Sequence, residues 1–100
     1  MENKHPLLEE RFKKSEQFVS RLIAGEAVLV PMRQNVGDLD CIYSLNETAA
    51  SAWELLDGNR PLRDVLASLL GEYEIGEEKA TQDLLGLVDQ LLGIGALEKV

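Results

Sequence analysis

Residues 39–58 read LDCIYSLNETAASAWELLDG, and the period of the hydrophobic residues changes inside this stretch. In its first part the residues that suit a buried face alternate with others, which is the pattern of a half-buried β-strand. They are Leu39, Cys41, Tyr43 and Leu45. In its second part the apolar residues recur at helical spacing, at Ala49, Ala52, Trp53 and Leu56. Asn46 is a favourable N-cap, so the stretch predicts a strand that leads directly into a helix.

Two shorter apolar runs precede this strand. Residues 18–23 are rich in apolar and β-branched side chains, and residues 27–30 form a second run. Gly25 and Glu26 supply a turn between them. Together with residues 39–45, these runs predict a small three-stranded antiparallel sheet.

Two more helices are expected after the first one. Pro61 is well placed to open a helix, and an amphipathic stripe runs from Leu62 to Tyr73. A third apolar stripe runs from about Glu77 to Leu92 and is followed by glycines. Strands followed by helices indicate an α+β domain, and three antiparallel strands followed by three helices are winged-helix-like.

The start of the chain differs from the rest. Residues 1–17 are crowded with charged side chains, so we expect a flexible or weakly ordered N-terminal tail there. The folded domain is expected over residues 18–100, since a chain of 100 residues fits one core.

Charge argues against one class of function. Eighteen Asp and Glu against ten Lys and Arg leave a net charge of −8. Proteins that bind DNA gain affinity by neutralising phosphates, so a winged-helix DNA-binding regulator is disfavoured but stays open. No apolar run approaches the length of a membrane-spanning helix and the start resembles no signal peptide, so we expect a cytoplasmic protein.

The chain offers little for catalysis. Its only histidine is His5, in the expected tail, and its only cysteine is Cys41, on the expected buried face. Catalysis needs a nucleophile, a base and an orienting group brought together, and these residues do not supply them. We therefore expect no enzyme activity, no metal site and no cofactor.

Several segments, taken in order, resemble the PqqD family. The main ones are Tyr43-Ser44-Leu45-Asn46-Glu47-Thr48-Ala49 and Ala52-Trp53-Glu54-Leu55-Leu56-Asp57-Gly58. The family usually has a Leu-Asn-x-Thr-Ala segment and then a Trp-x-Leu-Leu-Asp-Gly segment. Residues 23–31 are similar to its strand hairpin, and the resemblance covers about residues 18–97.

The resemblance implies a non-catalytic peptide chaperone, also called a recognition element for ribosomally made, modified peptides. Such a protein binds the leader of a precursor peptide as an added strand and presents it to a modifying enzyme, often of the radical SAM type. The product would be pyrroloquinoline quinone or a related peptide-derived compound. The resemblance implies a site made of one strand and the last helix: Leu39, Cys41, Tyr43, Leu84, Leu87, Val88 and Leu91.

Three expectations about partners follow. The acidic residues Glu77, Glu78 and Asp83 would favour a leader with basic residues. An exposed sheet edge would permit a homodimer without predicting one. A non-peptide alternative is an assembly factor that docks another enzyme through its third helix and the Trp53 region.

Overall fold

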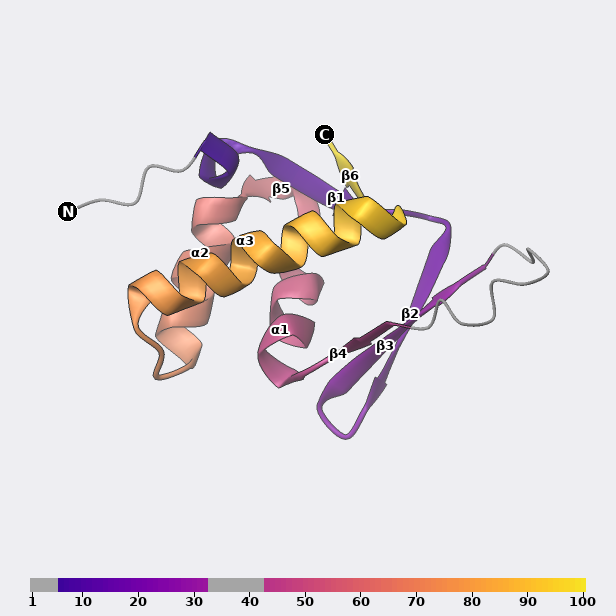
Figure 1. Ribbon diagram of the computed structural model, residues 1–100, viewed down its shortest axis with the longest axis horizontal. Coiled ribbons are helices and arrows are strands. Elements are labelled where there is room, and N and C mark those ends of the chain that lie inside the picture. The colour runs from indigo at the N-terminus through magenta and orange to yellow at the C-terminus, as the bar shows by residue number, and fades with distance from the viewer. Residues whose placement is uncertain (1–5, 33–42) are drawn as a thin grey trace.

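The computed structural model describes residues 6–32 and 43–100, and these form the α+β fold that the sequence predicts. Two three-stranded antiparallel sheets accompany three α-helices in the described part of the chain. Figure 1 shows the helices side by side, with the hairpin of β2 and β3 extending away from them.

The first sheet is the one expected from the sequence. It has the order β2-β3-β4, with β2 at Phe18–Ile23, β3 at Glu26–Pro31 and β4 at Tyr43–Leu45. The turn lies one residue earlier than expected, at Ala24 and Gly25, because Ile23 already pairs with Glu26. Both turn residues have positive φ, 54° and 85°, as a tight two-residue hairpin requires. Residues 39–42 of the expected third strand lie outside the described residues.

The three expected helices are confirmed. Helix α1 spans Glu47–Leu55, and the side chain of Asn46 caps it by accepting a hydrogen bond from the Ala49 N–H at 2.9 Å. Helix α2 spans Leu62–Glu72 directly after Pro61. Helix α3 spans Glu77–Ile94 and ends at Gly95, whose φ of 82° gives the left-handed conformation typical of a helix end.

The second sheet was not foreseen, and it includes part of the expected tail. Its order is β5-β1-β6, with β1 at Arg11–Lys14, β5 at Asp57–Pro61 and β6 at Leu97–Lys99. A short 3₁₀ helix, Pro6–Glu9, precedes β1. Leu8 and Phe12 from this region are buried, with 3% and 2% of their surface exposed. Residues 6–14 are therefore integrated into the fold, because β1 gains its partners from segments far along the chain.

The carboxyl group of Asp57 is stabilised in its charged form at the start of β5. It accepts a hydrogen bond from the Asn59 N–H at 2.9 Å and lies 3.2 Å from the Arg60 guanidinium. The Asn59 N–H and, after it, the Arg60 charge hold the pKa of Asp57 below its ordinary value. These contacts fix the turn that carries the chain from α1 into the second sheet.

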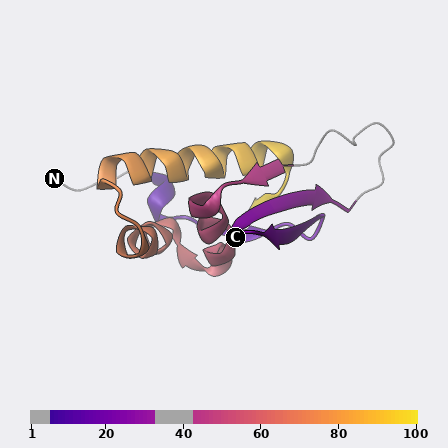
Figure 2. The same cartoon turned by 90° about the horizontal axis from the view of Figure 1, so that it is seen from below.

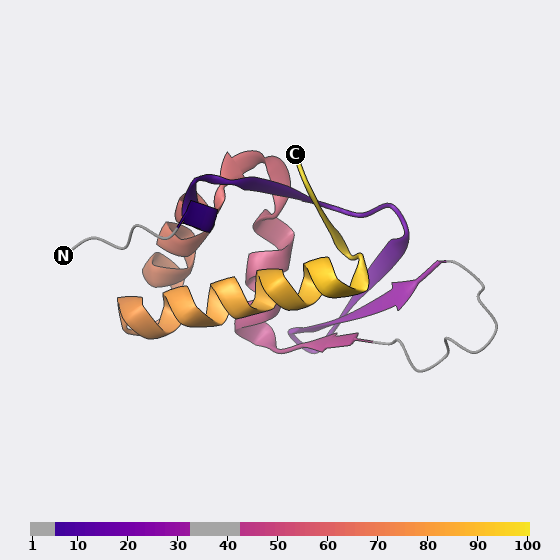
Figure 3. The ribbon, with the colours of Figure 1, turned by 45° about the horizontal axis from the view of Figure 1, so that its top comes forward.

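One core joins the helices to both sheets. Trp53 in α1 is 1% exposed and belongs to a core cluster that also includes apolar residues of α2, α3, β1 and β3. Figure 3 shows β1 running past the helices before the chain turns into β2. In Figure 2, α3 lies along one side of the molecule with β4 beside it, and β2 forms the far edge of that sheet. This arrangement sets β4 and α3 next to each other.

Candidate functional site

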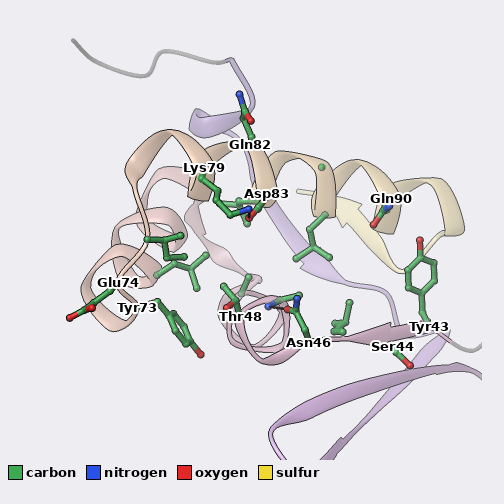
Figure 4. A pocket seen from close by; sticks show the side chains of 18 residues that line it. Tyr43, Ser44, Asn46, Thr48, Tyr73, Glu74, Lys79, Gln82, Asp83 and Gln90 are labelled. Atoms are coloured by element: carbon green, nitrogen blue, oxygen red, sulfur yellow. Dashed lines mark hydrogen bonds and ion pairs between the residues drawn. The ribbon is translucent and has the colours of Figure 1, made fainter.

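A groove of about 710 Å³ lies between β4, α1 and α3. Figure 4 shows Tyr43 and Gln90 at one end of it, and Tyr73 and Glu74 at the other. Its walls thus come from the strand, the start of α1, the turn between α2 and α3, and one face of α3. Its volume and open shape suit a segment of polypeptide.

The strand in this groove is an edge strand. Among the described residues, β4 pairs with β3 and with no other strand. In an antiparallel sheet, the backbone groups of successive residues point alternately toward and away from the neighbouring strand. The hydrogen bond from the Met32 N–H to the Gln17 C=O, at 2.6 Å, shows which residues of β2 and β3 point toward each other. When this alternation is continued from β3 to β4, the backbone N–H and C=O groups of Tyr43 and Leu45 point toward β3. The N–H and C=O groups of Ser44 therefore point to the free edge of the strand.

The groove floor is apolar. Leu45, Ala52 and Leu84 are almost fully buried, yet each contributes surface to the groove. Ala49 of α1 and Leu87 of α3 are half-buried and belong to the same floor. Such a floor accepts an apolar side chain from a bound segment.

Polar groups line the wall at the α2–α3 end. Lys79 and Asp83, one turn apart on α3, form an ion pair at 3.2 Å. The Tyr73 hydroxyl lies 2.6 Å from the Ser51 hydroxyl, so α1 is tied to the end of α2. With Glu74, the groove lining carries two acidic residues and one basic residue. The Lys79 contact already offsets the charge of Asp83.

The residues predicted for the site divide into three groups. Tyr43, Leu84 and Leu87 line the groove. Val88 and Leu91 are fully buried in the core beneath it and do not line it. Leu39 and Cys41 lie outside the described residues.

Sequence reasoning missed the residues beside the apolar stripe of α3. Besides the predicted leucines, the groove face of this helix carries Lys79, Asp83, Gly86 and Gln90, at spacings of three and four residues. The residues of this face form a row along α3 beside the apolar stripe that fills the core, so a search for apolar residues does not detect them. The same spacing rule, applied to the mixed polar row, would have found it.

Comparison with known proteins then gives the family. The profile of the family described as coenzyme PQQ synthesis protein D (PqqD) matches residues 26–97. The chain belongs to the PqqD family. The match includes β3, β4, all three helices and the start of β6, and so the whole groove of this PqqD-family chain.

A solved structure shares the fold of this PqqD-family chain. It is that of TbiB1 in complex with the TbiA(beta) leader peptide, with a TM-score of 0.71 and 22% sequence identity. The alignment covers 86% of this chain and 94% of that chain. The comparison with curated proteins gives no match.

The remaining features concern DNA binding, membrane spanning and metal binding by this PqqD-family chain. Helix α3 has a single basic residue, Lys79, which pairs with Asp83, so it offers no basic face to DNA. Within residues 6–32 and 43–100, no helix is long and apolar enough to span a membrane, and no cluster of three His, Cys, Asp or Glu residues could hold a metal ion.

Proposed function

We propose that this PqqD-family chain binds the leader region of a ribosomally made precursor peptide. The single observation that carries the proposal is the free edge of β4 beside the groove under α3. An extended peptide that adds to a sheet edge gains affinity from main-chain hydrogen bonds and specificity from pockets for alternate side chains. The family and the fold shared with a leader-peptide complex support the same function.

The geometry gives each part of the groove a role. The N–H and C=O groups of Ser44 exchange hydrogen bonds with the backbone of the leader. Because side chains of a strand alternate, every second leader residue faces the floor of Ala49, Leu84 and Leu87. The side chains between them face solvent. This pattern calls for a leader segment in which apolar and polar residues alternate.

The chain acts in this proposal as a carrier and not as an enzyme. In the described part of the chain, the groove offers an ion pair, hydroxyls and amides, and no residues of its lining pair a nucleophile with a base. A separate modifying enzyme, of the radical SAM type, would receive the bound precursor in the cytoplasm. The product would be pyrroloquinoline quinone or another peptide-derived compound, according to the precursor that the leader belongs to.

A pair of matched variants tests the proposal. Leu87 lines the groove and Leu92, on the same helix, is 37% exposed and does not. The probe is a synthetic peptide with the leader half of the short precursor encoded nearest to the gene of this chain. Leu87→Ala should weaken its binding about tenfold, measured by calorimetry, because a buried leucine contact contributes about 1.5 kcal/mol or more. Leu92→Ala should leave the affinity unchanged.

The outcome separates two functions. Equal affinities for both variants would mean that the peptide binds elsewhere. If the unmodified chain fails to bind the leader but binds the modifying enzyme, the assembly-factor alternative replaces the proposal.

A further inference from the structure

The edge of the sheet opposite the groove is apolar and exposed among the described residues. Every residue of β2 from Val19 to Ile23 is exposed, and Leu22 and Ile23 have 67% and 59% of their surface exposed. Within the described part of the chain, β2 pairs only with β3. Figure 2 shows β2 on the side of the sheet away from α3. An edge strand with apolar residues and free backbone groups is a template for pairing with another strand.

The ladder decides which backbone groups of β2 are free. The Gln17 C=O accepts a hydrogen bond from the Met32 N–H, so every second residue from Gln17 onward also points its backbone N–H and C=O toward β3. These residues are Val19, Arg21 and Ile23. Ser20 and Leu22 therefore direct both N–H and C=O to the open edge. Phe18 directs its C=O there, while its N–H donates to the Ser15 C=O at 3.4 Å.

The sequence of β2 selects one symmetric register. Two copies that pair antiparallel about a two-fold axis must oppose residues that lie on the same face of the sheet. With the axis at Ser20, Phe18 of one copy lies opposite Leu22 of the other. Every backbone group that points outward then takes part in the pairing. It also opposes Val19 to Arg21. An axis at Arg21 would oppose two like charges directly, which destabilises a sheet.

We infer that this chain forms a homodimer through antiparallel pairing of β2 with β2 of a second copy, with Ser20 at the two-fold axis. The inference goes beyond leader binding and does not depend on it. The two hairpins would join into one continuous sheet with both β4 edges at its outer ends. Each copy would keep its own groove free.

Charge favours this contact between identical chains. The chain carries a net charge of −8, so most of its surface repels a second copy. Strand β2 holds no acidic residue and one basic residue, Arg21. An apolar edge without acidic residues is where two such chains can approach at the lowest electrostatic cost.

Sedimentation equilibrium of the full chain, from micromolar to millimolar concentration, tests the inference. The unmodified chain should dimerise. Leu22→Lys should raise the dissociation constant about tenfold or more, because a lysine blunts a sheet edge. Val100→Lys makes the same change at a residue that is 63% exposed and outside β2, and should leave the constant within about twofold.

A second variant tests the backbone contact itself. Ser20→Pro removes the N–H that faces the open edge while sparing the bonds of β2 to β3, and edge strands tolerate such a proline. It should abolish the dimer while circular dichroism shows an intact fold and the leader still binds. A chain that stays monomeric at millimolar concentration overturns the inference. So does a dimer that Leu22→Lys and Val100→Lys weaken equally.

Discussion

At the scale of single residues, Lys14 links β1 to the end of α1. Its ammonium group donates to the carbonyl oxygens of Glu54 and Leu56, both at 3.3 Å, and lies 5.5 Å from the centre of the Trp53 ring. A cation at a helix C-terminus also opposes the negative end of the helix dipole. One side chain thus joins the second sheet to the helix that forms the groove wall.

Replacing this lysine should therefore cost stability. Lys14→Met keeps the aliphatic stem but loses the hydrogen bonds and the contact with the ring, and should lower the free energy of unfolding by about 1–2 kcal/mol. Urea denaturation measures the change. Lys13→Met is the control, because the ion pair of Lys13 with Glu98, at 3.9 Å, is exposed and is worth at most about 0.5 kcal/mol. Equal losses in the two variants would remove the special role of Lys14.

At the scale of elements, β1 is the central strand of the second sheet. It pairs with β5 on one side and β6 on the other, so it holds together the start, middle and end of the chain. Phe12, at 2% exposure, is the side chain that anchors it in the core.

Phe12→Ala should destabilise the protein by about 3–5 kcal/mol, since it leaves a large cavity in the core. Thermal unfolding followed by circular dichroism measures this. Lys13→Ala, on the opposite face of the same strand, should change stability far less. If residues 6–14 were a solvated tail, neither variant would shift the unfolding transition.

How far the sequence predicts an element depends on its length and its partners. Helices α1 to α3 and the β2–β3 hairpin are visible from their own periodicity or turn residues, because the signals are local. In the sequence of strand β5, Gly58 indicates the end of one helix and Pro61 the start of the next, so no strand is predicted there. Its pairing with β1 cannot be predicted from the sequence of either strand alone. Both are short strands whose partners lie tens of residues away.

The site was predictable to a similar degree. The resemblance to the PqqD family implies a site made of one strand and the last helix, and three of the residues that it points to, Tyr43, Leu84 and Leu87, line the groove. A resemblance carried by short segments does not tell which row of α3 faces the core, so it implied a contact role also for Val88 and Leu91, which are buried. That distinction depends on how α3 rotates against α1, which is a tertiary property.

At the scale of the whole molecule, the net charge of −8 leads us to expect a preference for partners with basic residues. Of the three acidic residues expected to select a basic leader, only Asp83 lines the groove, and Lys79 pairs with it. Glu74 adds a negative charge at the α2–α3 end, close in sequence to Glu77 and Glu78 at the start of α3. We therefore expect a preference for a basic leader to arise at this end of the groove.

A leader with basic residues should therefore bind more tightly than its charge-reversed counterpart, and the difference should shrink as salt rises. Fluorescence anisotropy with the two labelled peptides, at low and high salt, measures it. Glu74→Gln should reduce the difference. Equal affinities of the two peptides at both salt concentrations would rule out selection by charge.

We propose that a leader peptide adds to the free edge of β4. The most direct test of this proposal is an NMR titration of the isotope-labelled chain with the synthetic leader. We expect amide shifts confined to Ser44 and its neighbours in β4 and to the Asp83–Gln90 face of α3, with the Ser44 amide becoming protected from exchange. No shifts at high micromolar peptide, or shifts on β2 in place of β4, would contradict it.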